Sequence, residues 1–305
     1  MPLARQTPTR DEVFLDHLAH FVPDMSAAEA ALERLGFTLT PYTEQRNRTP
    51  AGMIPAGTAN RCAMLRNGYL EFLTRASDTP LARRLEAALS RYTGVHLLAM
   101  SVADADRAAA RLAGAGFAPD PVVNLTRDVA DADGRAAQAR FSVLRVAPET
   151  MPEGRIQILT HHTEALVWQD RWLVHRNGIV SLEAVLVAVA DPPEAAHRFA
   201  RFLDRAPRRL DPERWIVSLD RGTLVFAPDA RALEGGAAST PRDLPVIAGY
   251  ALGAPNPEDS AAIMAAGGAA PAHPASRDER ALRLPVELGG AVVLVAPGTS
   301  PAFAR

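Results

Sequence analysis

Three polar side chains interrupt apolar, strand-like segments of this sequence, and they are its best candidates for chemistry. His17, Glu71 and Gln157 supply an imidazole, a carboxylate and an amide at related points of a repeated unit. Strand alternation puts Tyr69, Glu71 and Leu73 on one face, and a carboxylate buried there is costly unless it is paired or coordinated. Two plainer interpretations stay open: His17 can be a buried, hydrogen-bonded histidine, and Glu71 can face solvent. The three groups predict a polar site inside an apolar cavity, of the kind that binds ligands.

The unit that carries these residues occurs twice in the first half of the chain. Leu15–Asp24 runs into a helical stretch that ends at Leu35–Phe37, and Gly94–Asp104 runs into one that ends at Ala115–Phe117. An internal repeat indicates an architecture before any single residue does. One small sheet cannot bury its apolar face alone, so we expect the two copies to pair.

Each copy is predicted to be a strand, a helix and three further strands, from its apolar periodicity and turn residues. In the first copy the expected elements are strand 15–22, helix 27–35, strand 37–41 and a hairpin of strands 60–65 and 69–73. In the second copy they are strand 95–102, helix 105–112, a strand from 117, and strands 139–146 and 155–159. The polar segments 42–57 and 126–136 are expected to be loops.

The same order of elements recurs with less fidelity in the second half of the chain. A third unit runs over Ser181–Ala227 and a fourth over Val246–Ala296. We therefore predict an α+β fold, with four tandem βαβββ modules that form two pseudo-symmetric, sheet-lined cups. The expected domains are a module pair at 13–160 that holds the candidate site, a connecting segment at 161–179, and a degenerate module pair at 180–297.

Composition narrows the classes of function. The chain has 305 residues, a formal net charge of −2 and 48% hydrophobic residues, which fit a soluble globular protein and offer no basic face for nucleic acid. The single cysteine, Cys62, excludes an internal disulfide and fits a reducing cytoplasm. Met1–Val13 has no apolar core of the kind that a signal peptide needs, and no run of apolar residues is long enough for a membrane span. Because every positive charge is an arginine, which is typical of GC-rich bacterial coding, we expect a bacterial, cytoplasmic protein with a small-molecule ligand, and we leave a homo-oligomer open.

Two motifs in this module order resemble a known superfamily. The motif D-H-L-x-x-x-V-P-D opens the first unit at Asp16–Asp24, and Y-L-E-F-L closes it at Tyr69–Leu73. Together with the tandem modules they resemble the vicinal oxygen chelate superfamily, and more narrowly its glyoxalase-like proteins. The resemblance is good over 13–160 and is limited to module order from 180 to 297. The superfamily includes glyoxalase I, methylmalonyl-CoA epimerase, extradiol dioxygenases and antibiotic-binding proteins of the bleomycin-resistance type, so membership does not choose a reaction.

The resemblance also implies a metal site. In the metal-dependent members, the first and last strands of two modules each contribute one ligand inside the cup. Mapped onto this chain, these ligands are His17 and Glu71 from the first module and Gln157 from the last strand of the second. An imidazole nitrogen with carboxylate and amide oxygens suits Zn, Ni, Mn, Co or Fe in an open site. The third and fourth modules carry no such pair of His and Glu, so we expect that half to be structural.

The fourth ligand place is contested between His96 and Leu97. Val22 follows His17 by five residues, whereas the corresponding Val102 follows Leu97 by five. Strand alternation then puts Leu97 in the ligand place and turns His96 away, unless a bulge restores it. With His96 the set holds the four ligand types that the resemblance implies, and without it three remain.

Five further side chains are candidates for contact with substrate. Asn60 and Arg61 enter a strand of the first module, and Arg140 is expected at the corresponding place in the second, where a guanidinium fork can hold a carboxylate or phosphate. His161 follows the last strand of the second module. Trp168 lies in the connecting segment, where an aromatic side chain can line a pocket or pack between the two cups. The plainer alternative for each residue is a surface, ion-paired or packing role.

The leading interpretation is a glyoxalase-like enzyme, of lyase, isomerase or dioxygenase type, that acts on a small oxygenated molecule in the N-terminal cup. A divalent metal held by His17, Glu71 and Gln157 would bind vicinal oxygens of the substrate, or Glu71 would be the proton-transferring base. The alternative is a metal-free protein that binds or sequesters a small molecule, and Leu97 in the fourth place favours it. A structural paralogue without chemistry is a third interpretation.

Overall fold

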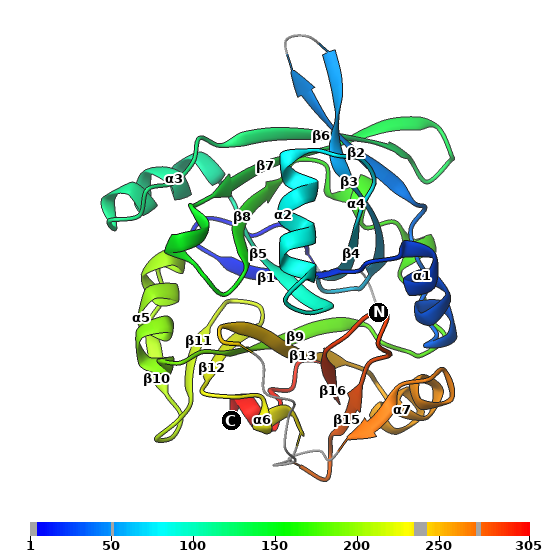
Figure 1. The fold of residues 1–305 in the computed structure, drawn as a ribbon, viewed down its shortest axis with the longest axis vertical. Coiled ribbons are helices and arrows are strands. Elements are labelled where there is room, and N and C mark those ends of the chain that lie inside the picture. Colours follow the sequence, from blue (N-terminus) through cyan, green and yellow to red (C-terminus); the bar gives the residue numbers. More distant parts are fainter. Residues whose placement is uncertain (1–4, 50–51, 235–242, 273–275) are drawn as a thin grey trace.

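Each half of the chain folds into one eight-stranded sheet made of two similar units. The ribbon of the computed structural model shows the first half above the second (Figure 1). The structure describes residues 5–49, 52–234, 243–272 and 276–305. The first four residues of Met1–Val13, the segment without the apolar core of a signal peptide, lie outside the described residues. The elements of the first unit are β1 (Val13–Phe21), α1 (Met25–Arg34), β2 (Thr43–Thr49), β3 (Gly52–Met64) and β4 (Tyr69–Arg75). After α2 (Pro80–Leu89), those of the second are β5 (Gly94–Val102), α3 (Ala105–Gly114), β6 (Val123–Ala130), β7 (Ala136–Arg145) and β8 (Arg155–His161).

The second half repeats this order after a short connection that holds α4 (Glu164–Val167). The third unit consists of β9 (Ser181–Ala188), α5 (Pro192–Leu203), β10 (Pro207–Arg209), β11 (Trp215–Ser218) and β12 (Thr223–Ala227), followed by α6 (Arg231–Glu234). The fourth consists of β13 (Val246–Gly253), α7 (Pro257–Ala266), β14 (Ala270–Ala272), β15 (Arg280–Arg283) and β16 (Ala291–Val295). Single 3-10 turns occur at η1 (Pro148–Thr150), η2 (Asp170–Trp172) and η3 (Ala302–Ala304). Within the described part of the chain, no helix has the length and apolar character that crossing a membrane requires.

The two sheets have the same topology. The strand order is β2-β3-β4-β1-β5-β8-β7-β6 in the first and β10-β11-β12-β9-β13-β16-β15-β14 in the second. In each unit the first strand pairs in parallel with the last, and the first strands of the two units pair antiparallel at the centre of the sheet. The predicted α+β fold of four tandem modules in two sheet-lined cups is confirmed. The division into domains at 13–160, 161–179 and 180–297 stays a prediction.

The turn from strand to helix is encoded in the same way in every unit. Asp24, Asp104, Asp191 and Asn256 each cap the helix that follows the first strand, because their side chains accept backbone N–H groups of its first turn. Those N–H groups have no partner within the helix, and a capping side chain stabilises it by about 1 kcal/mol. The repeat is visible in the sequence because this signal falls at the same point of each copy.

Two segments predicted to be loops are edge strands instead. Residues 43–49 and 52–57 belong to the β2–β3 hairpin, and residues 126–130 belong to β6, whereas 37–41 has no regular structure. These strands bury few side chains, so they lack the apolar alternation that predicts a strand. The two edge strands also contact each other, because the Arg127 guanidinium in β6 donates a hydrogen bond to the Arg46 carbonyl in β2 at 2.7 Å. The two edges of the first sheet thereby come together.

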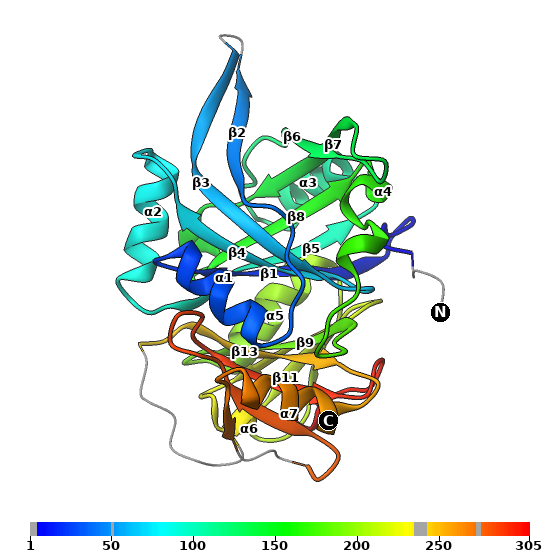
Figure 2. The same cartoon turned by 90° about the vertical axis from the view of Figure 1, so that its right-hand side faces the viewer.

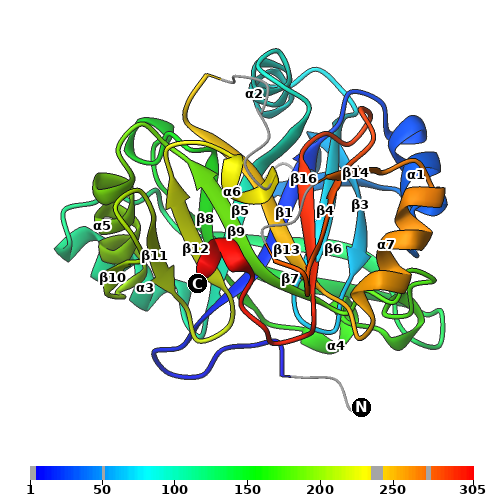
Figure 3. The same cartoon turned by 90° about the horizontal axis from the view of Figure 1, so that it is seen from below.

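The convex faces of the sheets pack against each other and share one apolar core (Figure 2). Leu18 and Leu98 of the first sheet belong to the same cluster as Val185 and Leu252 of the second. Helices flank this core in pairs, with α1 beside α7 and α3 beside α5 (Figures 1 and 3). Burial of both sheet backs and of the inner helix faces is the main favourable contribution to the stability of the fold.

The concave face of the second sheet is filled by side chains of the chain itself. Leu233 from α6 and Phe303 from η3 pack into an apolar cluster on that face, and each is 1% exposed. Gly249 is needed there, because a Cβ at this position would lie 2.4 Å from the Ala291 carbonyl oxygen and 2.7 Å from Leu233 Cδ1. This packing leaves the first cup as the place for a site.

A buried histidine joins the two halves. The ring of His20 in β1 donates from Nδ1 to the Leu288 carbonyl at 2.9 Å and accepts at Nε2 from the Tyr250 hydroxyl at 2.9 Å. The partners assign these roles, since a carbonyl can only accept. Burial, opposed by the Leu288 carbonyl and assisted by His96, lowers the pKa of His20 to about 4.

This histidine predicts how stability depends on pH. Between pH 6.5 and about 4 the unfolded chain binds a proton at residue 20 that the folded chain does not, so the free energy of unfolding falls as the pH falls through this window. The full loss, reached below pH 4, is about 3.5 kcal/mol, from about 1.4 kcal/mol for each unit of pKa difference. Denaturant unfolding at pH 7.0 and 4.5 should show a smaller loss for His20→Gln than for wild type. The matched variant His197→Gln removes an exposed histidine and should behave as wild type; equal losses in His20→Gln and wild type would contradict the assignment.

Candidate functional site

The first cup holds a cavity of about 130 Å³. Leu85 of α2 packs into one end of the cup, and Trp168 packs with Met64 and Tyr69 near the other. Its polar wall includes His17, Gln45, Asn60, Glu71, Gln157 and three arginines, Arg127, Arg145 and Arg155. Its apolar wall includes Leu73, Leu97, Leu125, Phe141, Val143 and Leu159. Both modules contribute to one hollow, so residues far apart in the sequence face a common space.

His17 and Glu71 lie side by side in this wall. Residue 71 of β4 is in register with Ala19 of β1, two residues after His17, and the His17 Nε2 atom lies 3.8 Å from Glu71 Oε2. The other carboxylate oxygen, Oε1, accepts hydrogen bonds from Asn60 Nδ2 at 2.6 Å and Gln45 Nε2 at 3.3 Å. Glu71 is 8% exposed, and the hydrogen bonds from Asn60 and Gln45 both go to Oε1. The atom that lies near the His17 imidazole at the cavity is therefore Oε2.

A second, fully buried carboxylate lies behind His17. Asp16 Oδ1 accepts from His17 Nδ1 at 2.7 Å, and Asp16 Oδ2 accepts from His161 Nε2 at 3.0 Å. Burial acts to raise the pKa of Asp16, but the two histidines outweigh it and hold this pKa well below its usual value. The bond to Asp16 sets the orientation of the His17 ring, so Nε2 is the ring nitrogen that faces the cavity.

The contested fourth place is occupied by Leu97. The β5–β8 register sets Leu97 opposite Arg155 and Ala99 opposite Gln157, as the β1–β4 register sets His17 opposite Tyr69 and Ala19 opposite Glu71. Leu97 is therefore the counterpart of His17, and it lines the cavity.

A bulge does occur at this point of β5, but it does not bring His96 to the site. The pairing of β1 and β5 shifts between Ala19 with Leu97 and His20 with Val95, which leaves His96 as the extra residue. The His96 ring stacks on Tyr92, with centroids 3.9 Å apart, and its Nε2 donates to the Tyr92 carbonyl at 2.7 Å. The cavity wall therefore holds Leu97 but not His96.

Three of the five residues expected to contact substrate lie in or directly behind the wall. Asn60 lines the cavity and holds Glu71. His161 is buried behind the wall, where it bonds Asp16. Trp168 is buried next to it, with ring centroids 4.8 Å apart, and also packs on Tyr69. His161 and Trp168 thus support the wall from behind.

The other two expected residues point away from the cavity. The Arg61 guanidinium pairs with Glu29 of α1 at 2.8 Å and donates to the Thr40 carbonyl at 2.9 Å. Arg140 has an exposed side chain. The register explains this, because Arg145 rather than Arg140 pairs with Gln157 as Cys62 pairs with Glu71. The arginines that reach the cavity are thus different residues.

The residues present do not fit a tightly held divalent metal. His17, Glu71 and Gln157 do converge, but Leu97 has no donor atom and Gln157 Oε1 accepts from Arg145 Nε at 3.4 Å. No group of three or more His, Cys, Asp or Glu side chains suited to a metal occurs among the described residues. Three arginine cations line the same wall as the one carboxylate, and their charge opposes that of a metal ion.

The residues that sequence reasoning missed are Gln45, Arg127, Arg145 and Arg155. Gln45 and Arg127 lie on the two polar edge strands that were taken for loops. Arg155 and Arg145 lie on predicted strands, and the signal that could have found them is the two-residue spacing of Arg155 from Gln157, which sets both on one face. Burial and the charges of Arg155 and Arg127 lower the pKa of Arg145 to about 10, although the charge of Asp120 acts against them.

Comparison with known proteins gives one family match and several similar folds. The family model described as a glyoxalase-like domain matches residues 15–203, which span the first two units and continue into α5. No curated protein matches the chain.

Solved structures of low sequence identity share the fold. A hypothetical protein from Staphylococcus aureus has a TM-score of 0.63 and 8% identity, over 93% of this chain and 99% of that one. A Mn(II)-bound glyoxalase from Novosphingobium aromaticivorans has a TM-score of 0.54 and 11% identity, over 97% and 85%. A catechol 2,3-dioxygenase has a TM-score of 0.54 and 13% identity, over 95% and 92%. At these identities the similarity concerns the fold alone.

Proposed function

The chain belongs to the glyoxalase-like domain family, within the vicinal oxygen chelate superfamily, and from this premise we propose that it binds a small oxygenated molecule in the N-terminal cup and moves a proton on it. The observation that carries the proposal is the pair of His17 Nε2 and Glu71 Oε2, 3.8 Å apart in a cavity wall. An imidazole and a carboxylate at hydrogen-bonding reach of one ligand are a general acid–base pair.

The step is a proton transfer next to a carbonyl group. Glu71 Oε2 takes the proton from a C–H bond, and the electron pair of that bond remains on the substrate as an enolate. Return of the proton to the neighbouring carbon or oxygen completes an isomerisation and restores the carboxylate. Asn60 and Gln45 hold the other oxygen of Glu71, so the base is oriented before the ligand arrives.

His17 is the second proton-carrying group of the proposal. Its Nδ1 is engaged by Asp16, so Nε2 can exchange a proton with a bound oxygen atom. The enolate charge develops in a cavity that guanidinium groups also line, and fixed cations stabilise such charge. The neighbour described as a Mn(II)-bound glyoxalase shares the fold, but the steps proposed for this chain use only its own side chains.

Proton transfer is tested by hydrogen–deuterium exchange. Chelator-treated protein is incubated in D₂O with pyruvate or with hydroxyacetone, and proton NMR follows the loss of the C–H signals next to the carbonyl. Wild type should accelerate exchange of at least one of the two compounds over buffer, and Glu71→Gln should lower that rate by about 100-fold, the usual contribution of a general base. The matched variant Glu44→Gln, which changes an exposed glutamate of β2, should leave the rate unchanged. An unchanged rate in Glu71→Gln would remove Glu71 from the role of base.

A metal-free binding protein is the second candidate, and the apolar wall favours it. Six apolar side chains, Leu97 among them, line the same cavity as the acid–base pair. A protein that only sequesters its ligand needs this wall but no proton transfer. This candidate would be favoured over the enzyme if wild type bound a probe but did not accelerate exchange of its C–H protons for deuterium.

A further inference from the structure

Three arginines of the cup form no ion pair with a carboxylate of the described residues. Arg127 donates only to the backbone carbonyls of Arg46 and Thr126, at 2.7 and 3.0 Å, and Arg145 donates to the amide oxygen of Gln157 at 3.4 Å. The backbone of Arg155 pairs within the sheet, but within the ranges that the structure describes its guanidinium has neither a hydrogen bond nor an ion pair. The wall thus holds three guanidinium groups and, among its carboxylates, Glu71 alone.

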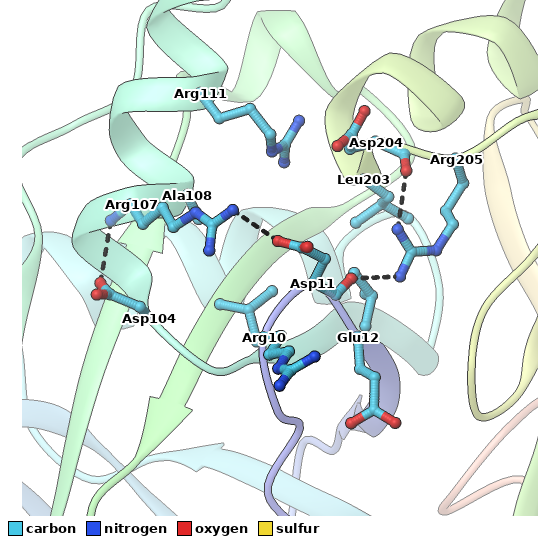
Figure 4. A pocket seen from close by; sticks show the side chains of 12 residues that line it. Arg10, Asp11, Glu12, Asp104, Arg107, Ala108, Arg111, Leu203, Asp204 and Arg205 are labelled. Atoms are coloured by element: carbon cyan, nitrogen blue, oxygen red, sulfur yellow. Dashed lines mark hydrogen bonds and ion pairs between the residues drawn. The ribbon is translucent and has the colours of Figure 1, made fainter.

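Two arginines elsewhere in the molecule have acceptors for their guanidinium groups and serve as a comparison. A second cavity, of about 80 Å³, lies between β1, α3 and the end of α5 (Figure 4). There Arg107 pairs with Asp11 at 2.7 Å, and Arg205 donates to the Asp11 and Asp204 carbonyls at 2.7 and 2.8 Å. These arginines already have acceptors within the chain, which assigns that cavity a structural role. Arg107 and Arg205 each pair with a carboxylate, Asp11 and Asp220 respectively. In the part of the chain that the structure describes, none of the three cup arginines forms such an ion pair.

The three charges also disfavour one another. Burial lowers the pKa of Arg155, Glu71 acts against this, and Arg84 and Arg127 add to the lowering. Burial likewise lowers the pKa of Arg127, with Glu71 acting against it. A cluster of partly buried like charges is unfavourable unless an opposite charge joins it. Fork-shaped guanidinium groups pair best with the planar or tetrahedral oxygens of a carboxylate or phosphate.

We infer that the ligand of the N-terminal cup is an organic anion, with a carboxylate or phosphate group held by Arg145, Arg155 and Arg127 and an apolar body packed on the leucine side of the wall. This inference rests on the proposed use of the cup as a ligand site and names the class of its ligand. The apolar body is required because Leu73, Leu97 and Leu159 line the same space as the arginines. An inorganic ion would leave that surface uncovered.

The inference also separates binding from chemistry. Glu71 is the carboxylate of the same wall, so it repels an anion that the arginines attract. Removing its charge should therefore tighten anion binding while it slows proton transfer by about 100-fold. A neutral ligand would show no such gain.

The test is calorimetric titration of the full chain at low ionic strength with four probes. Benzoate and phenyl phosphate carry the two anionic groups on one apolar body, benzamide is the neutral analogue of benzoate, and inorganic phosphate has no apolar body. At least one of the two aromatic anions should bind at least tenfold more tightly than benzamide and than inorganic phosphate. The stronger of the two identifies the anionic group. Equal or tighter binding of benzamide, or no binding of any probe at millimolar concentration, overturns the inference, and equal binding of inorganic phosphate overturns its apolar part.

Variants assign the binding to the arginines. Arg145→Gln and Arg155→Gln should each weaken the better anion at least tenfold, and Glu71→Gln should strengthen it two- to tenfold. Arg208→Gln, which changes an exposed arginine of β10, should leave the affinity within twofold of wild type. Unchanged affinity in Arg145→Gln and Arg155→Gln overturns the inference even when proton exchange depends on Glu71. If Glu71→Gln loses proton exchange but still binds the anion, the result supports both the acid–base role of Glu71 and the anion site. If Glu71→Gln retains proton exchange, the result contradicts only the acid–base role.

A second measurement does not depend on the choice of probe. Because an unpaired, partly buried cation is removed, ligand-free Arg155→Gln should melt about 1–2 °C higher than ligand-free wild type. A lower melting temperature would show that Arg155 stabilises the empty cup, and it would contradict the inference. Circular dichroism of the same samples establishes that the variant is folded.

Discussion

Replacement of Asp16 by asparagine is expected to lower the rate of the proposed proton transfer by about 1,000-fold or more, since loss of a carboxylate that holds an imidazole in one tautomer costs about 10⁴ in rate in other acid–base sites. Asp16 accepts from two imidazoles at once, His17 Nδ1 at 2.7 Å and His161 Nε2 at 3.0 Å. An asparagine has one acceptor oxygen, so its NH₂ group must face one of these rings. That ring then has to change tautomer or turn, and the His17 Nε2 atom loses its fixed position.

Asp16→Leu separates the structural part of this effect. It leaves two ring N–H groups without an acceptor in a site where Asp16 is 0% exposed, so the free energy of unfolding should fall by about 3–5 kcal/mol. Denaturant titration of both Asp16 variants, with exchange assays of Asp16→Asn under conditions where it is folded, distinguishes stability from positioning.

The adjacent histidines provide the matched control. His161→Gln removes a partner of Asp16, whereas the neighbouring His162 bonds Ser142 at 2.7 Å and does not touch Asp16. His161→Gln should change the exchange rate, and combined with Asp16→Asn it should cost less than the sum of the two separate effects, because both act on one hydrogen-bonded unit. His162→Gln should leave the rate as in wild type. Additive effects of Asp16→Asn and His161→Gln would argue against a shared unit.

Replacement of Leu97 by histidine is expected to create a metal site that the wild-type cup does not hold tightly. Leu97 is the counterpart of His17 in strand register, so an imidazole there faces Glu71 and Gln157 across the cavity. Affinity for Zn²⁺ or Mn²⁺ should rise by about 100-fold or more, since even a partner outside the ligand shell is worth about 10–100-fold. Metal analysis after dialysis, together with a competition titration against a chelator, measures this gain.

The control for this prediction is the histidine next to Leu97 in the sequence. His96→Gln should leave metal affinity unchanged, because the His96 ring donates to the Tyr92 carbonyl and stacks on Tyr92. A loss of metal in His96→Gln would show that this ring reaches the site after all. Stoichiometric, tightly held metal in wild type would contradict the conclusion that these residues do not fit a divalent metal. It would favour a metal-dependent enzyme instead.

Much of the architecture could be predicted because it depends on signals between residues that are close together in the sequence. The capping residues Asp24 and Asp104 and the apolar runs around them recur at fixed points, so the module order and the pairing of copies follow from the sequence. The edge strands β2 and β6 could not be predicted in this way. They bury few side chains, and their backbone groups are satisfied only because neighbouring strands are present.

The site could be predicted only in part, for the same reason. His17 and Glu71 stand out because each polar group lies in an apolar strand, and their proximity follows from the parallel pairing of first and last strands. Arg127 and Arg145 read as ordinary polar residues in the sequence. Only the curvature of the sheet, which brings its edge strands β2 and β6 together, turns these two side chains into the same hollow.

By itself the sequence determined the α+β class, the four modules and the offset that makes Leu97 the counterpart of His17. These features depend on period, spacing and caps, which act over a few residues. The tertiary structure alone decided that Asp16 bridges two histidines, that His96 is held by Tyr92, and that three arginines meet in a wall whose one carboxylate is Glu71. Such facts depend on strand register and on how far a sheet curves, and the free energy that sets both is spread over the whole core.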